Sequence, residues 1–178
     1  MDKNQINQII KSKGFSDFKW IDVKEIVIAQ WVRFKCMFGC NSYGTKATCP
    51  PQVPSIAECK AFFGEYKDAV LIHIPKKLEN PEDRVEWGKS VNEKLIEIEK
   101  DIFLLGFRKA FILFMDECQI CKDCAVTRDA CHYKMQARPC PEGLGVDVFE
   151  TAHKCNFPIE VLKDYRSEMN RYSILLIE

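Results

Sequence analysis

The chain has 178 residues, 47% of them hydrophobic, so it is long enough to form one domain with an apolar core. Its 26 basic and 26 acidic residues balance, which removes the electrostatic argument for binding nucleic acid or an anionic membrane surface. No apolar run has the length of a transmembrane helix, and the polar first residues do not resemble a signal peptide. We therefore expect a single domain over residues 1–178, located in the cytoplasm.

The first thirty residues predict one helix and two strands. Three isoleucines recur at helical spacing within residues 3–13, and Gly14 follows as a helix-terminating glycine. Residues 18–23 and 25–29 are rich in isoleucine, valine and tryptophan without a helical period, which predicts strands.

Residues 36–51 form the first cysteine-rich segment. The segment contains Cys36, Cys40 and Cys49, and its glycine, asparagine, serine and proline residues predict a turn-rich loop. In such a loop, backbone N–H groups can point at metal-bound sulfur and tune the site by hydrogen bonding.

A helix is predicted after this loop, because Ser55 and Glu58 form a capping-box pattern ahead of an apolar run that ends near Phe63. Cys59 lies on this helix. We expect it to be a small buried apolar residue rather than a metal ligand, since lone cysteines are often simply buried.

The middle of the chain predicts a strand over 68–74, a long helix over 81–105 and a second strand over 109–115. Parallel neighbouring strands here would make a right-handed βαβ unit, with the charged helix positions on a solvated face. The second cysteine-rich loop, 116–141, begins at the carboxyl end of the second strand, where sites of α/β proteins gather.

Beyond Pro141, the pattern predicts a helix over 146–155 with Asp147 near its start, a short helix from Pro158 and a last strand over 172–177. We therefore expect an α/β or α+β fold. It would contain a mixed sheet of about four strands with a βαβ unit, helices packed on the sheet, and both cysteine-rich loops at one edge.

Ten cysteines in a reducing compartment indicate metal binding or catalysis rather than disulfides. Cys118, Cys121 and Cys124 form a C-x2-C-x2-C run, which Cys131 and Cys140 follow. Three closely spaced thiolates with a more distant fourth are typical of iron–sulfur sites. We expect a [4Fe–4S] cluster on the first four of these cysteines, with Cys140 as the alternative fourth ligand.

Cys36, Cys40 and Cys49 predict a second cluster whose fourth ligand is not evident from the sequence. The candidates are Cys140, Cys59, Cys155, a non-cysteine group, or an exogenous small molecule on an open iron. An open iron binds substrate, whereas a closed cluster mostly transfers electrons. Zinc is the alternative metal, although a third thiol in each group exceeds what a zinc knuckle uses.

These motifs resemble a family of small proteins, mainly from anaerobic bacteria and methanogens, known only as predicted metal-binding proteins. The resemblance covers nearly the whole chain, and the matching residues are Arg33, Cys36, Cys40, Tyr43-Gly44, Cys49-Pro50-Pro51, Cys118, Cys121, Cys124, Cys131, Ala137-Arg138-Pro139, Glu142 and Gly145-Val146-Asp147-Val148. The family pattern has serine at the position of Cys140 and no fixed cysteine at Cys59 or Cys155. The resemblance therefore favours Cys131 as the fourth ligand of the second loop. It implies metal binding in anaerobes and brings no established activity.

Three functions follow from these observations. The first is an electron-transfer or redox accessory protein that carries one or two [4Fe–4S] clusters and docks to a redox partner protein. The second is an enzyme that binds a small substrate at an open iron, with Arg33, Lys46 or Arg138 as the anion partner. The third is a zinc-stabilised binding module. We favour the first, because no catalytic acid, base or nucleophile pattern is evident. His132, next to Cys131, is expected to be exposed or to lie beside the site.

Overall fold

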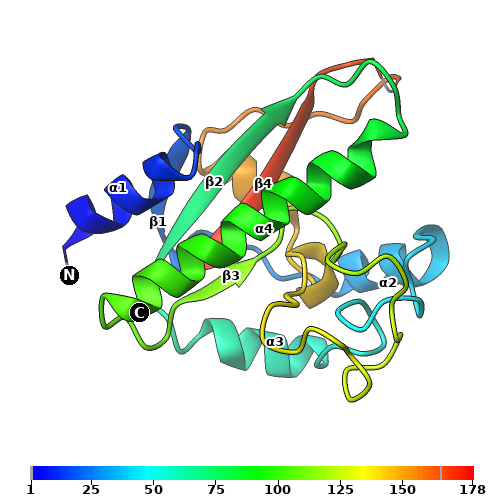
Figure 1. Cartoon of the computed structure of the whole chain (residues 1–178), viewed down its shortest axis with the longest axis horizontal. Helices are drawn as coiled ribbons and strands as arrows, with labels where there is room; N and C mark the ends of the chain where they lie inside the picture. Colours follow the sequence, from blue (N-terminus) through cyan, green and yellow to red (C-terminus); the bar gives the residue numbers. More distant parts are fainter. Residues whose placement is uncertain (1, 165) are drawn as a thin grey trace.

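The computed structural model describes residues 2–164 and 166–178 and contains a four-stranded sheet in the order β1-β2-β4-β3 (Figure 1). The strands are β1 (Phe18–Asp22), β2 (Asp68–Lys76), β3 (Phe111–Leu113) and β4 (Met169–Leu176). Every neighbouring pair is antiparallel, and the pairing of β2 with β4 extends over the whole length of β4. These two strands are therefore the centre of the sheet.

Five α-helices and two short 3-10 helices accompany the sheet in the described residues. They are α1 (Lys3–Ser12), η1 (Val23–Glu25), α2 (Gln30–Gly39), α3 (Ile56–Phe63), α4 (Asp83–Leu104), η2 (Glu142–Leu144) and α5 (Val148–Lys154). The predicted capping box is confirmed, because the Ser55 and Glu58 side chains cap α3 reciprocally, and Asp147 caps α5. Within the described part of the chain, no helix has the length and apolar character needed to cross a bilayer.

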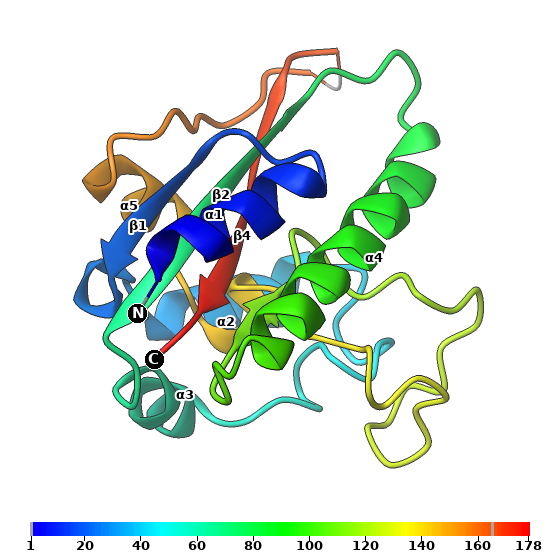
Figure 2. The same ribbon diagram turned by 60° about the vertical axis from the view of Figure 1, so that its left-hand side comes forward.

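Helices cover both faces of the sheet. Figure 2 shows α1 and α4 together in front of the strands, and their apolar residues pack with Val70 and Ile72 of β2. On the opposite face, α3 and α5 pack with Ala69 and Leu71. This alternation follows from the two-residue period of a strand, which sends successive side chains to opposite faces. The fold is thus a three-layer α/β arrangement with one apolar core on each face.

The predicted mixed sheet with a βαβ unit of neighbouring strands is wrong. Strands β2 and β3 do run parallel, with α4 as the connection, but β4 lies between them and is antiparallel to both. The C-terminal strand takes this central place because its second half is continuously buried, and such a strand needs apolar cover on both faces.

Three further expectations are corrected. Residues 25–29 do not form a strand, because this stretch contains the end of η1 and a single bridge between Ile28 and Val146. Helix α2 extends through Gly39, so the first four residues of the predicted loop 36–51 are helical. Residues 158–164 and 166–168, where a short helix was predicted, have no regular secondary structure.

Candidate metal centre

Cys36, Cys40, Cys49 and Cys140 line one cavity of about 220 Å³. Cys36 is in the last turn of α2 and Cys40 directly follows that helix, whereas Cys140 lies two residues before the start of η2. The Cys140 sulfur accepts a hydrogen bond from the Gly143 backbone N–H at 3.3 Å. The structure thus places Cys140 with the first cysteine group, whose fourth member the sequence left open.

Backbone contacts hold the start of α2 against the segment that follows Cys140. The Ala29 N–H donates to the Gly145 carbonyl at 2.9 Å, and Ile28 forms its bridge with Val146. Gly145 has a φ of +83°, and a Cβ there would lie 2.2 Å from the Ile56 side chain. Only glycine fits this position without strain, so the close approach of Cys36 and Cys140 depends on it.

The second cysteine group lies in the loop that leaves the edge strand β3, and consists of Cys118, Cys121, Cys124 and Cys131. Cys131 and two other members pack with Ala47 and Ala137. The Ala47 backbone N–H donates to the Cys124 sulfur at 3.3 Å. One backbone N–H of the first loop thus points at a cysteine sulfur of the second group, whereas the N–H that reaches Cys140 belongs to η2.

The two groups are neighbours. Ala47, which contacts the second group, is two residues before Cys49 of the first group, and Glu117 lines the first cavity directly before Cys118. The two loops also lie on the same side of the sheet in both ribbon views (Figures 1 and 2). Eight of the ten cysteines are therefore gathered in one region.

Burial and like charge both oppose ionisation of Cys49 and Cys140. Burial is the main cause that raises the pKa of Cys49 to about 12, and the charges of Glu117, Cys40 and Cys36 act in the same direction. Burial likewise raises the pKa of Cys140 well above its ordinary value, with Glu142 adding to the effect. Thiols in such surroundings become thiolates when a cationic centre binds them, because metal ligation requires the deprotonated form.

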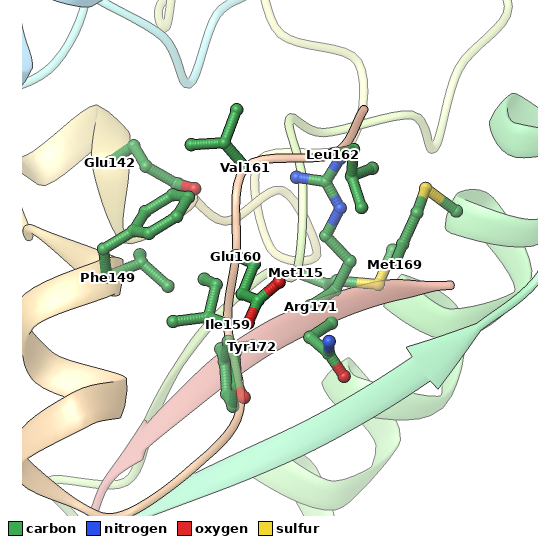
Figure 3. A pocket seen from close by; sticks show the side chains of 12 residues that line it. Met115, Glu142, Phe149, Ile159, Glu160, Val161, Leu162, Met169, Arg171 and Tyr172 are labelled. Atoms are coloured by element: carbon green, nitrogen blue, oxygen red, sulfur yellow. The ribbon is translucent and has the colours of Figure 1, made fainter. Parts of the chain in front are cut away.

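Three acidic residues line the first cavity, namely Asp116, Glu117 and Glu142. Asp116 is buried and accepts two hydrogen bonds of 3.0 Å from Arg84. Burial raises the pKa of Glu142 to about 7, and the charge of Asp116 adds to this effect. Glu142 also borders a further cavity of about 210 Å³, where it lies across from Arg171 of β4 (Figure 3).

Polar residues on α4 hold the second loop in place, although sequence reasoning assigned the charged positions of this helix to a solvated face. Arg84 binds Asp116 at the start of the loop. One turn on, a Cβ at Gly88 would lie 2.5 Å from the Gln119 side-chain oxygen, so glycine leaves room for Gln119. The next turn presents Asn92, which is fully buried and accepts a hydrogen bond from the Met115 N–H at 3.3 Å.

Glu99 continues this polar face and is paired with Arg138 in a largely buried ion pair. The Glu99 carboxylate also accepts a 2.7 Å hydrogen bond from the Ile112 N–H of β3. The remaining guanidinium nitrogen of Arg138 donates to the Met135 and Ala137 carbonyls. The residues of this face, from Arg84 through Gly88 and Asn92 to Glu99, are four, four and seven positions apart. Such spacing places side chains on one side of a helix, so it is the sequence signal for this face.

The other predicted residues have structural or peripheral positions. Arg138 is fully engaged, so the structure does not support it as an anion partner. Arg33 donates to the Pro54 carbonyl at 3.0 Å. Lys46 lies in the first loop, where its carbonyl accepts from the Cys49 N–H at 3.1 Å. His132 is exposed.

Cys59 and Cys155 belong to neither group. Both are buried in the core that α3 and α5 form with the sheet, and the Cys59 thiol donates to the Pro54 carbonyl at 3.6 Å. The expectation that Cys59 is a buried apolar residue is confirmed. All ten cysteines are free thiols in the structure.

Comparison with known proteins supplies one finding. No curated protein and no solved structure matches the chain. Residues 19–177 match the profile of the family described as "Predicted metal-binding protein (DUF2284)", and this stretch contains all eight grouped cysteines. The chain therefore belongs to this family of predicted metal-binding proteins.

Proposed function

We propose that the chain binds two [4Fe–4S] clusters and acts in electron transfer, as a redox accessory protein of anaerobic metabolism. The observation that carries this proposal is the gathering of eight cysteines into two neighbouring groups of four. One cluster would be held by Cys36, Cys40, Cys49 and Cys140, and the other by Cys118, Cys121, Cys124 and Cys131. A cluster with four cysteine ligands supplies reversible one-electron transfer.

The number and spacing of the thiols support a cluster over zinc. A structural zinc site usually combines two pairs of ligands, whereas each group here offers three thiols along one stretch of chain and a more distant fourth. A cubane takes one thiolate on each of four irons, so its ligands stand further apart. The donor set of thiols with backbone N–H groups directed at sulfur fits this larger object.

The position of Cys140 supports a closed cluster over an enzyme with an open iron. Cys140 supplies the first group with a fourth thiol, which leaves no corner for a substrate. Arg138, one of the cations considered as a substrate partner, is already paired with Glu99. Electron transfer is thus better supported than substrate binding at iron.

An exposed apolar face next to the first group suits docking of a redox partner protein. Helix α2 exposes Trp31, Phe34, Met37 and Phe38, with 76% of Phe38 accessible. These residues flank Cys36 on the same helix. Large exposed apolar side chains that gather in one place are typical of protein interaction sites.

Metal analysis of anaerobically purified protein tests the proposal. Two clusters predict about eight irons and eight acid-labile sulfides per chain, with reversible reduction in a potentiometric titration. Zinc without sulfide would overturn the proposal in favour of a structural zinc module. Reproducible loading of about four irons would overturn the assignment of one of the two groups.

Single cysteine variants test the ligand assignment. Cys140→Ala and Cys131→Ala should each lose about half of the iron and sulfide, because each removes one ligand of a different four-thiol set. Cys59→Ala is the matched control, since its thiol is buried outside both groups, and should keep the full content. Full iron content in Cys140→Ala would exclude this residue as a ligand.

A further inference from the structure

A cavity of about 550 Å³ lies between α3 and the loops that carry both cysteine groups. Its wall combines Ala47 and Thr48 of the first loop, residues 52–54 that follow this loop, residues 137–139 of the second loop, and Cys59 and Phe62 of α3. The volume lies in the range of about 300–1,000 Å³ that is usual for small-molecule sites. This cavity is separate from the cavity that the cysteines Cys36 and Cys140 line.

The cavity wall is mainly apolar and includes two aromatic rings. Val53, Leu144, Phe62 and Phe111 contribute apolar surface. The rings of Phe62 and Phe111 meet edge to face, with centroids 5.4 Å apart. Such ring edges and faces favour contact with another planar aromatic group.

Two of the charged residues in the wall are already engaged. The guanidinium of Arg138 is paired with Glu99, and Glu58 accepts hydrogen bonds from Ser55 in the capping box. Arg138 is not available to a ligand without losing this ion pair, and Glu58, whose two hydrogen bonds both use Oε2, offers acceptors and no donor. The ligand-directed polar groups must therefore come from elsewhere in the wall.

Arg128 and Thr48 are those groups. Arg128 is exposed at the cavity and donates one hydrogen bond of 2.6 Å to the Lys134 carbonyl, which leaves guanidinium N–H groups on its other nitrogens. Thr48 is only 4% exposed, and its hydroxyl has no hydrogen-bond partner among the described residues. An unpaired buried hydroxyl is costly, and a hydroxyl in a cavity wall can donate a hydrogen bond to a ligand oxygen. A cation and a hydroxyl donor together favour a ligand with an acidic oxygen.

We propose that this cavity binds a small planar aromatic acid, with the ring system between Val53, Phe62 and Phe111 and the carboxylate at Arg128. The proposal goes beyond cluster binding and does not depend on it. Ala47 and Ala137 line the cavity and also pack on cysteines of the second group. Only the side chains of these two alanines would therefore separate a bound ligand from the cysteines of the second group.

Calorimetric titration of the full, anaerobically purified chain with 2-naphthoate tests this site. We expect saturable binding with one site per chain, much weaker binding of 2-naphthol because it lacks the carboxylate, and much weaker binding of octanoate because it lacks the ring. Absence of 2-naphthoate binding would overturn the proposal. Equal binding of octanoate would overturn the aromatic class of the ligand.

Paired variants place the ligand in the cavity. Arg128→Gln should weaken 2-naphthoate binding roughly tenfold, the loss expected for one hydrogen bond to a charged group. Val53→Trp should abolish binding by filling the cavity. The controls are Arg108→Gln, another exposed arginine, and Val161→Trp at a different cavity, and both should bind as the parent chain does.

Iron and sulfide are measured on the same samples, so that a failure of the ligand cavity can be distinguished from a failure of the proposed clusters. Normal binding by Val53→Trp would overturn the site, whatever the metal content. Loss of iron with unchanged 2-naphthoate binding would leave the site supported and count against the clusters alone.

Discussion

Glu99 lies on α4 with only 11% of its side chain exposed, and its carboxylate accepts hydrogen bonds from the Ile112 backbone and from Arg138. Arg138 in turn lies in the second cysteine-rich loop, two residues before Cys140. One carboxylate therefore joins a helix, the edge strand and the loop between the two cysteine groups. A buried charge pair of this kind is costly to break, because removal of one charge leaves the other uncompensated.

Glu99→Gln should lower the free energy of unfolding by about 3 kcal/mol, since it leaves the Arg138 charge without its partner. Glu97→Gln is the matched control on the same helix. Glu97 is 58% exposed and contacts Lys13, so its loss should cost less than about 1 kcal/mol. Urea denaturation of both variants measures the difference. Equal destabilisation by the two substitutions would show that the ion pair of Glu99 with Arg138 contributes no more to stability than an exposed ion pair does.

At the scale of elements, α2 and η2 are joined where the cysteines of the first group meet. Gly145 adopts a φ of +83° and leaves no room for a Cβ, whereas Gly44 has a φ of +71° with open space around it. The two glycines therefore share a positive φ but differ in packing. Comparing alanine substitutions at the two positions separates the cost of placing a Cβ in left-handed backbone from the cost of a steric clash.

Gly44→Ala should destabilise the protein by about 1 kcal/mol, the cost of placing a Cβ in left-handed backbone. Gly145→Ala should cost about 1–3 kcal/mol more, because its Cβ would press on Ile56 and force the packing apart. Thermal unfolding followed by circular dichroism compares the two. Similar melting temperatures for both variants would argue against close packing between η2 and α3.

Local signals predicted several elements correctly, and non-local pairing explains the failures. Helix α3 followed from its capping box and α1 from its isoleucine spacing. Helix α2 was missed because Trp31, Phe34 and Phe38 are apolar yet exposed, so the segment lacks the polar face that marks a surface helix. The place of β4 in the sheet was also missed, because strand order depends on which strands meet in space and not on the pattern within one strand.

The candidate site was likewise predictable where its residues are close along the chain, and not where distant segments meet. Spacing within each loop marked the local sets, such as Cys118 with Cys121, because these residues are neighbours along the chain. The sequence named Cys140 as one of several candidates for the fourth member of the Cys36 group but could not select it, because the two segments meet through long-range contacts such as those of Gly145 and Val146 with the start of α2. The structure supplies that pairing, and the nature of the bound metal stays a prediction.

At the scale of the whole molecule, the apolar cores use little of the candidate metal centre. Among the described residues, the buried members of the two cores on the faces of the sheet include none of the eight grouped cysteines, although Cys118 packs, partly buried, against the core that α1 and α4 form. The cysteine loops otherwise pack in a small cluster around Ala47, Cys131 and Ala137. A chain of this length can bury enough apolar surface to fold without metal.

Removal of metal should therefore loosen the cysteine loops and leave the sheet folded. Treatment with chelator and oxidant should preserve the far-ultraviolet circular dichroism, while trypsin cleavage at Lys122 and Arg128 becomes faster. Mass spectrometry of the fragments identifies the cleavage sites. Loss of the circular dichroism signal on metal removal would show that the metal holds the entire fold together.

The central place of β4 has a consequence for synthesis on the ribosome. Strands β2 and β3 each pair with β4, which is translated after both of them and after all ten cysteines. During translation the sheet stays open along its middle, and long-range pairing of this kind is slow to form. All ten cysteines are therefore synthesised before the sheet that positions their loops can close.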